Sequence, residues 1–396
     1  MTTQNHYTKI KRLEIFSEEK ELTKFLETNF TESLKQMIKV TVKTMVKTEM
    51  ELLRKELDKK PYFNGYYDRN MISSFGKVED IPIPRFRQQV SGMDLKTIGV
   101  FTEEQQKFMR LIEQMHLLGI NQRKIKHLSR ICFGIPISAD RVGVIYKELA
   151  EKEEININHQ ILDDDFEYLI LDGIWEKTKG YGWDDNQSVL LCALGIRPNG
   201  ERKIIGFSLE RHEDNETWGK LVKQIKDRGF KGTNLKLAIA DDHQSIKNAV
   251  ERYFPGLPVQ LCIIHKMRNV INKTKFKNRK AVADDIKSIF QSQSKEEAME
   301  KAKATVKKWY MVESKAMESL RFNIEYCFTY MQFPKNIWSK IRTTNILDRE
   351  FREFRRRMKV FDNTFQNEES ANRYTNSIIN YLNSYYPLKG GLYTNA

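Results

Sequence analysis

FEYLILDGIW at residues 166–175, SVLLCALGIR at 188–197 and KIIGFSLE at 203–210 are three apolar runs that are rich in β-branched side chains. Turn signals separate them, among them Pro198-Asn199-Gly200. Short apolar runs bounded by turn residues are typical of consecutive strands joined by hairpins. The sequence therefore predicts three antiparallel strands near the middle of the chain.

The next part of the chain alternates between helical and strand patterns. It reads ETWGKLVKQIKDRGF (216–230), LKLAIADD (235–242), HQSIKNAVERYF (243–254) and VQLCIIH (259–265), which predict helix, strand, helix and strand. The complete order, β-β-β-α-β-α-β, is typical of a ribonuclease H-like sheet, in which antiparallel hairpin strands precede parallel crossovers. The predicted fold class is therefore α/β, with a ribonuclease H-like mixed sheet as its core.

The net charge of the chain indicates which kind of partner it binds. The chain has 396 residues, with 67 Lys and Arg against 53 Asp and Glu, and its formal charge is +14. Such an excess attracts polyanions, so nucleic acid is the first candidate, although ribosomal, membrane-surface and heparin-binding proteins share this property. At roughly 100–200 residues per domain, the length predicts about two to four domains.

Cysteine usage and hydropathy bear on the compartment. Cys132, Cys192, Cys262 and Cys327 are widely spaced, which favours free thiols in a reducing cytoplasm. The N-terminal residues lack a signal-peptide pattern, and no run approaches the roughly 20 apolar residues of a membrane span. We expect a soluble intracellular protein with no membrane partner.

The flanks of the core are mainly helical in pattern. A basic stretch after the last strand is too long for a loop and predicts an all-helical insertion in the core. The predicted organisation is an N-terminal helical region (1–60), a DNA-binding region (61–155), the first part of the core (156–265), the insertion (266–338), and the rest of the core with a C-terminal helix and tail (339–396).

The two N-terminal regions have different patterns. In the first, an apolar stripe predicts helices with one sticky face, suited to helix packing or dimer formation, or to phosphate contacts through the many lysines. That stripe consists of Leu34, Met37, Ile38, Val42, Met45 and Leu52. The second begins with turn residues, aromatics and prolines, which indicate a short β segment or an extended connector.

Residues 117–152 predict a helix-turn-helix. The pattern is a helix, a tight turn at residues 133–136, and a second helix capped by Ser138. Arg141 and Lys147 lie on the second helix, where they would face the major groove of bound DNA. Helix pairs joined by a glycine turn also occur without DNA, so both interpretations stay open.

Carboxylates end two of the predicted strands. Asp172 closes the first strand and Asp241 the fourth, at the sheet edge where open α/β sheets gather their active residues. Two such carboxylates and a third can hold a pair of Mg²⁺ or Mn²⁺ ions for phosphodiester chemistry. Taken singly, each is equally a turn or cap residue, and Asp242 competes with Asp241 unless it caps the next helix. The acidic run 163–165 is predicted to be a solvated turn.

Three further side chains are candidates near this edge. Cys262 and His265 form a C-x-x-H pair on or just after a strand, but a structural zinc site needs about four ligands and the sequence offers no second spaced pair. Trp218, in a predicted amphipathic helix, either fills the core or stacks on a base.

Seven short segments of the chain, in order, resemble one family. They are Asn64-Gly65-Tyr66-Tyr67-Asp68-Arg69, the stretch 119–146, Leu171-Asp172-Gly173-Ile174-Trp175, Trp218 with Arg228-Gly229, Asp241-Asp242-His243, Gln260-Leu261-Cys262-Ile263-Ile264-His265 with Arg268-Asn269, and Thr343-Thr344-Asn345. Together they resemble the bacterial insertion-sequence transposases of the Mutator-like group, and the resemblance runs from about Asn64 to Tyr374.

This resemblance implies a DDE-type transposase whose first two acidic residues are Asp172 and Asp241, with Cys262 and His265 close to the active site. The family pattern places a Glu three residues after the Asn of Thr-Thr-Asn, where this chain has Asp348. Glu350 and Glu353 would point to other faces of the predicted helix. Asp348 is therefore the predicted third acid, with a reach shorter by about 1 Å.

The resemblance also implies the reaction and its partners. We expect Mg²⁺- or Mn²⁺-dependent cleavage at element ends, followed by strand transfer into target DNA. The expected partners are double-stranded DNA with terminal inverted repeats, target DNA, and at least one more copy of the chain, in the bacterial cytoplasm at the nucleoid. Phosphate contacts are expected from Arg268, Arg349, Arg352, Arg355 and Arg356. The alternatives are a nuclease of the same fold without strand transfer, and a decayed or domesticated DNA-binding protein without catalysis.

Overall fold

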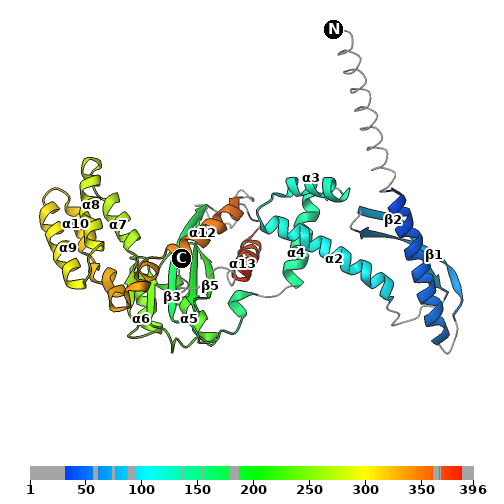
Figure 1. Cartoon of the computed structure of the whole chain (residues 1–396), viewed down its shortest axis with the longest axis horizontal. Coiled ribbons are helices and arrows are strands. Elements are labelled where there is room, and N and C mark those ends of the chain that lie inside the picture. The colour runs from blue at the N-terminus through cyan, green and yellow to red at the C-terminus, as the bar shows by residue number, and fades with distance from the viewer. Residues whose placement is uncertain are drawn as a thin grey trace, which may run out of the picture. The chain divides into compact units, whose positions relative to one another are not determined.

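The structure is a computed structural model of the chain, which divides into two compact units, Met1–Glu151 and Lys152–Ala396 (Figure 1). It describes residues 32–56, 61–73, 76–87, 95–135, 137–152, 156–177, 187–359, 365 and 367–385. Within these ranges, no helix is both long enough and apolar enough to cross a membrane. What was predicted for residues 1–31 lies outside them.

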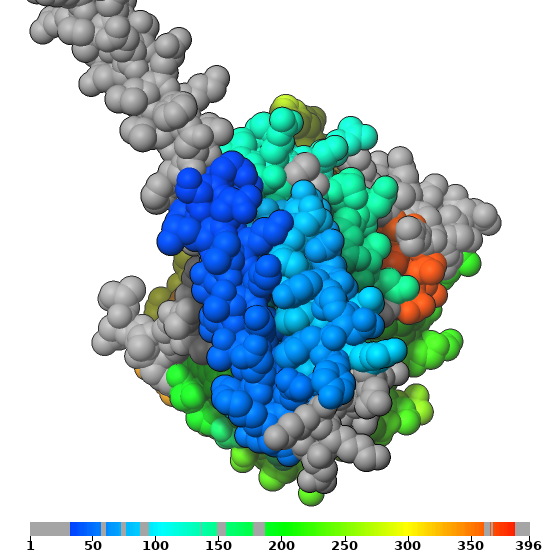
Figure 2. Space-filling view, turned by 90° about the vertical axis from the view of Figure 1, so that its right-hand side faces the viewer, coloured from blue at the N-terminus to red at the C-terminus, as the bar shows by residue number. Residues whose placement is uncertain are grey.

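The first unit begins with a helix over residues 32–56 that packs along a β-hairpin (Figure 2). The hairpin consists of β1 (Phe63–Ser73) and β2 (Gly76–Phe86), paired antiparallel. The helix buries a narrow stripe that includes Val42, Val46 and Met50. The alternative of a short β segment for this region is thus confirmed.

The apolar stripe predicted for this helix is only partly covered by the described residues. Met37, Met45 and Leu52 are 65%, 52% and 55% exposed, so a dimer role for their part of the face stays a prediction. Only the side chains at spacing i, i+4 through Val42 and Val46 are covered, because a two-stranded hairpin is too narrow to cover a wider arc of the helix.

Three helices complete the first unit: α2 (Lys96–Leu117), α3 (Gln122–Phe133) and α4 (Ala139–Lys152). Gly134 ends α3 in the left-handed conformation with φ 64°, which a glycine adopts without steric cost. The Ser138 hydroxyl accepts a hydrogen bond from the Arg141 amide at 3.1 Å and so caps α4. The predicted helix, turn and helix are confirmed; Pro136 in the turn lies outside the described residues.

The second unit is built on a five-stranded mixed sheet. Its strands are β3 (Tyr168–Lys177), β4 (Gln187–Ile196), β5 (Arg202–Glu210), β6 (Leu237–Ala240) and β7 (Val259–Leu261), in the order β5-β4-β3-β6-β7. β3, β4 and β5 pair antiparallel, whereas β6 and β7 run parallel to β3. The predicted mixed α/β sheet is confirmed.

Two crossover helices, α5 (Asn215–Asp227) and α6 (Gln244–Tyr253), cover one face of the sheet. Leu169 and Leu171 of β3 point to that face and belong to its apolar core. Because side chains alternate along a strand, Asp172 points to the opposite face. There, α12 (Asn345–Met358) contacts β3, and α13 (Glu368–Tyr385) contacts β5.

The chain between β7 and α12 contains no strand, and all of it is described. It comprises α7 (Ile263–Asn272), η2 (Phe276–Asn278), α8 (Arg279–Phe290), α9 (Lys295–Trp309), α10 (Ser314–Arg321), η3 (Ile324–Gln332), η4 (Lys335–Ile337) and α11 (Trp338–Ile341). In Figure 1, α7 to α10 form a bundle beyond the β7 edge of the sheet.

The strand predicted over 259–265 was too long. It ends at Leu261, and the carbonyl of Cys262 accepts the first hydrogen bond of α7, from the amide of Lys266 at 3.0 Å. The apolar run fits a strand and a buried helix start equally well. Lys266 and Arg268, predicted as part of the helical stretch 266–338, lie on this helix.

Candidate metal centre

The parallel register of the sheet places the strand-end residues in one row. Leu171 pairs with Ala240, and Ala240 pairs with Leu261. The residues that follow these three are Asp172, Asp241 and Cys262. The two aspartates predicted from strand ends are therefore neighbours across adjacent strands.

A segment distant in sequence joins this row through backbone contacts. The Ile263 amide donates to the Arg342 carbonyl at 3.2 Å, and the Thr344 amide lies 3.4 Å from the Cys262 sulfur. α12 begins directly afterwards, and its Asp348 amide donates to the Thr344 carbonyl at 3.1 Å. Asp348 thus stands in the first turn of a helix that starts at the sheet edge.

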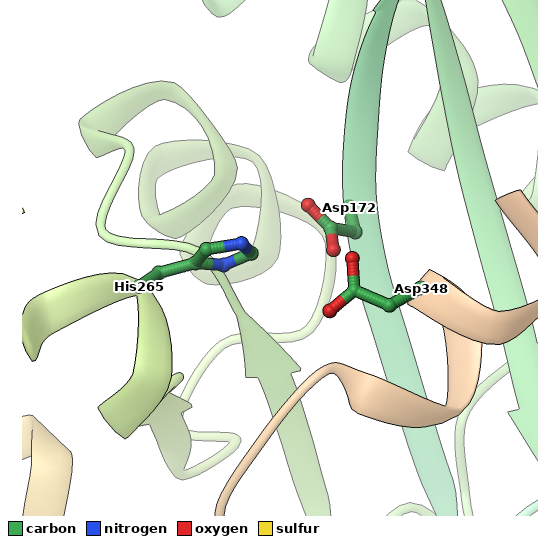
Figure 3. A group of neighbouring side chains, drawn as sticks. All are labelled: Asp172, His265 and Asp348. Atoms are coloured by element: carbon green, nitrogen blue, oxygen red, sulfur yellow. The ribbon is translucent and has the colours of Figure 1, made fainter. Parts of the chain in front are cut away.

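Asp172, His265 and Asp348 point toward one another (Figure 3). One ligand atom from each lies within 4.8 Å of the other two, as an ion-binding group requires. Asp241 adjoins this group, with Oδ1 3.4 Å from Nδ1 of His265. The structure therefore brings together all three predicted acidic residues and the predicted nearby histidine.

Asp172 is the most buried acid of the group. Its side chain is 3% exposed; Oδ1 accepts a hydrogen bond from the Gly173 amide at 3.0 Å, and Oδ2 has no hydrogen-bond partner among the described residues. Burial raises the pKa of Asp172 to about 7, and the charges of Asp241 and Asp348 act in the same direction, against His265. A buried, unpartnered carboxylate oxygen among other carboxylates is a site that a cation would stabilise.

His265 supplies positive charge beside these acids. Burial lowers its pKa, but the hydrogen bond and charge of Cys262, with the carboxylates of Asp241 and Asp172, outweigh this effect and raise the pKa to about 9. Conversely, His265 lowers the pKa of the Cys262 thiol despite its burial. Cys262 and His265 thus interact with each other beside the acidic residues.

The donor chemistry fits a hard divalent ion. Mg²⁺ and Mn²⁺ prefer carboxylate oxygens, which Asp172, Asp241 and Asp348 offer. Asp172, Asp241 and Asp348 are therefore the residues that fit such ions, and His265 lies beside them.

Asp242, the competitor of Asp241, is occupied elsewhere. Its carboxylate accepts a hydrogen bond from the Lys266 ammonium group, whose side chain is fully buried. The same ammonium donates to the carbonyls of Ser319 at 3.2 Å and Phe322 at 2.6 Å. Asp242 therefore joins the sheet edge to the end of α10, and it does not cap α6.

Trp218 packs as a core residue. It is fully buried among the side chains between the sheet and α5, and its indole N–H donates to Glu213 at 3.1 Å. This favours the core-filling interpretation, because stacking on a base needs an exposed ring face.

The predicted DNA-facing arginines differ in their surroundings. Arg268, Arg349 and Arg352 are exposed. Arg356 is exposed but pairs with Glu353 at 3.1 Å, while Arg355 pairs with Glu176 at 2.6 Å. The first three are better placed to bind phosphate, since none of them forms an ion pair with a carboxylate of the described residues.

In the helix-turn-helix, the basic surface lies mainly on the first helix. On α4, Arg141 pairs with Glu148 at 3.2 Å, and Lys147 also has an interaction partner. On α3 a contiguous exposed face carries no acid at all. This face consists of Arg123, Lys124, Lys126, His127 and Arg130. The run QRKIKHLSR at residues 122–130, which is basic and contains no acid, could have predicted this face. The prediction placed the DNA contacts on the second helix only.

Comparisons with known proteins show which family the chain resembles in sequence. A model of the family described as "Transposase, Mutator family" matches residues 1–386. The transposase for insertion sequence element ISRM5 of Rhizobium meliloti is 25% identical over 368 residues, 87% of this chain and 91% of the relative. The transposase for IS256 in transposon Tn4001 of Staphylococcus aureus is 28% identical over 80% of each chain. That for IS905 of Lactococcus lactis is 25% identical, over 78% of this chain and 77% of the relative.

Proposed function

Because the chain belongs to the Mutator family of transposases of insertion sequence elements, we propose that it cuts DNA at the ends of its element and joins the freed 3′-hydroxyl to target DNA. We assign the chemistry to a DDE-type site formed by Asp172, Asp241 and Asp348. The fold proposed for this unit is a ribonuclease H-like core with an all-helical insertion.

The convergence of three carboxylates from separate parts of the chain is the observation that supports this site. Two come from adjacent parallel strands, and the third comes from a helix that begins more than a hundred residues later, at the same sheet edge. A turn or cap role explains each acid alone but not their meeting. The sheet order, with three antiparallel strands followed by two parallel ones, supports the ribonuclease H-like fold.

Phosphoryl transfer requires positioning and charge stabilisation more than covalent chemistry. Bound by Asp172, Asp241 and Asp348, Mg²⁺ or Mn²⁺ would activate the attacking oxygen and stabilise the leaving oxygen. His265, with Nδ1 3.4 Å from Oδ1 of Asp241 and a raised pKa, would lower the repulsion among the carboxylates when it carries a proton. Exposed Arg268, Arg349 and Arg352 are proposed to hold the DNA backbone near this edge.

The remaining regions are proposed to deliver DNA. We assign recognition of the terminal inverted repeats to residues 61–155, which include the helix-turn-helix, and the chemistry to 156–265 together with 339–396. Residues 266–338 form the insertion, and 1–60 the N-terminal helical region. Two element ends must be paired for transposition, so we propose that at least two copies of the chain assemble on DNA.

The test is a strand-transfer assay with purified protein, Mg²⁺ or Mn²⁺, and labelled DNA that carries the element ends flanking the gene. Asp172→Asn is compared with Asp163→Asn, an exposed aspartate of the same unit outside the site. We expect 3′-end cleavage and joined products that vanish with Asp172→Asn and persist with the control. Cleavage without joining would favour a nuclease, and DNA binding without products would favour a non-catalytic protein.

A further inference from the structure

The helical insertion exposes two large apolar side chains on adjoining loops. Phe276, in η2 between α7 and α8, is 86% exposed, and Met311, between α9 and α10, is 92% exposed. Both loops are fully described, and no part of the second unit's described residues covers either side chain. Exposed apolar side chains clustered on one surface mark an interaction site more often than chance.

The two loops are held together by an acid that points inward. Glu313 is 4% exposed; its carboxylate accepts from the Lys275 amide at 3.1 Å and from the Asn278 side chain at 2.7 Å. The Lys275 ammonium group also donates to the Val312 carbonyl at 3.3 Å. Phe276 and Met311 are therefore presented by a braced pair of loops, which we call the insertion tip (272–281 and 306–316).

Charge identifies the kind of partner that fits this tip. Its basic residues are Lys273, Lys275, Lys277, Arg279, Lys280, Lys307, Lys308 and Lys315. Its single acid is the inward-facing Glu313. Of the basic groups, Lys308 is paired with Asp285, whereas Lys277 and Lys280 are exposed and form no ion pair with a described residue. The surface around the two apolar side chains is thus strongly positive.

We propose that the insertion tip binds double-stranded DNA, with the lysines on phosphates and with Phe276 and Met311 pressed into the minor groove at a base step. Proteins that bind there combine basic side chains with apolar wedges that partly unstack a step and bend the duplex. A second copy of the tip fits less well, because the two basic surfaces would repel each other where they meet. The inference rests on the proposed function in that the substrate is DNA.

The test measures DNA binding and unstacking without catalysis. Full-length protein in EDTA is titrated onto a 30-base-pair duplex without element ends, with 2-aminopurine at a central TA step, and both anisotropy and base fluorescence are recorded. The apolar variant is Phe276→Ser with Met311→Ser. Its control is Ile161→Ser, which removes a side chain that is 91% exposed on the same unit. The charge variant is Lys277→Gln with Lys280→Gln, and its control is Lys231→Gln with Lys303→Gln, which are also exposed.

The expected results separate the contribution of the two apolar side chains from that of the lysines. The apolar variant should lose the rise in 2-aminopurine fluorescence and about tenfold in affinity, while the slope of log affinity against log salt stays unchanged. The charge variant should lower that slope by about 1.8, at about 0.9 for each lost phosphate contact. All four proteins should keep the wild-type thermal unfolding curve, since every substituted side chain is exposed.

Three outcomes would overturn the proposal. One is unchanged DNA binding by both variants; another is a change of molar mass in light scattering with the apolar variant, which would indicate contact with a second copy. The third is a variant that no longer binds anionic phosphatidylserine vesicles but still binds DNA as the wild type does. A failure of strand transfer in the Mg²⁺ assay with normal unstacking in EDTA would contradict the proposed function but not this inference.

Discussion

Asp348 reaches the acidic row in spite of its short side chain. One of its ligand atoms already lies within 4.8 Å of those of Asp172 and His265, because the Thr344 contacts start α12 close to the sheet edge. A Glu at this position would carry its carboxylate about 1 Å further and crowd the group. We therefore expect Asp348→Glu to lower the rate of 3′-end cleavage by about 10–100-fold, and Asp348→Asn to abolish it.

Single-turnover cleavage on pre-nicked element ends measures this effect, with DNA binding in EDTA as the control for folding. A faster Asp348→Glu protein would mean that the natural aspartate is a handicap and that α12 stands further from the sheet than described. Glu353 is no substitute acid, because Arg356 and Arg357 already bind its carboxylate.

Lys266 is predicted to matter for stability. Removal of one member of a buried ion pair leaves an uncompensated charge, which costs about 3–5 kcal/mol. We expect Lys266→Met to lower the free energy of unfolding of the second unit by about this amount, and Lys266→Met with Asp242→Asn to recover part of it. Urea denaturation followed by tryptophan fluorescence measures both. Equal losses in the single and double variants would show that the ion pair with Asp242 is not the source.

His116 makes the first unit sensitive to acid. This α2 residue is 1% exposed, and its ring centroid lies 5.5 Å from that of Tyr146 on α4. Burial lowers its pKa below the usual 6.5. The unfolded state therefore binds the proton more tightly, so stability is complete above about pH 6.5 and falls as the pH drops toward the folded pKa.

Hydrogen exchange of α2 and α4 peptides in the full chain at pH 7 and pH 5.5, corrected for intrinsic rates, should show lower protection at the lower pH. His127→Gln, which removes an exposed histidine of the same unit, should keep this dependence, and His116→Gln should lose it. Protection independent of pH in the wild type would contradict the linkage.

At the scale of elements, the DNA-binding face of the helix-turn-helix is predicted to be α3. Its basic side chains fall within an arc of about 160° at 100° per residue, whereas Arg141 on α4 is held by Glu148. We expect Arg123→Gln with Lys126→Gln and Arg130→Gln to weaken DNA binding and to lower the salt slope by about 2.7. Arg141→Gln should change the slope by less than 1, and fluorescence anisotropy over a salt series tests both. An equal or larger effect of Arg141→Gln would return recognition to α4.

Elements were predictable where one signal dominated. The runs of β3, β4 and β5 are long, β-branched and bounded by turns, and Asp172 and Asp241 followed from strand ends. The end of β7 was not, because VQLCIIH fits both strand and helix and the choice depends on the contact of Ile263 with Arg342, far away in sequence. The Lys266–Asp242 ion pair was not predicted either, because it depends on where α7 begins. With α7 beginning at Ile263, Lys266 faces the sheet edge.

At the scale of the whole molecule, the proposed recognition of element ends and the proposed chemistry fall in different units. The acid-free face of α3 lies within Met1–Glu151, while every residue of the proposed metal centre lies within Lys152–Ala396. Both units carry more basic than acidic residues, so each attracts DNA by itself. On this proposal, covalent linkage would bring the second unit to an element end bound by the first at an effective concentration that separate molecules do not reach.

This argument predicts the behaviour of the two units as separate proteins. Fragment 1–151 should bind duplex DNA equally well in EDTA and in Mg²⁺, with steep salt dependence, because none of the metal-site acids belongs to it. An equimolar mixture with 152–396 should cleave element ends about 10²–10⁴-fold more slowly than the intact chain at the same concentration, since the tether is lost. Anisotropy and single-turnover cleavage measure the two effects. Full cleavage by 152–396 alone would show that the second unit finds element ends without help, and would move end recognition from the helix-turn-helix to the surface around α12 and the insertion.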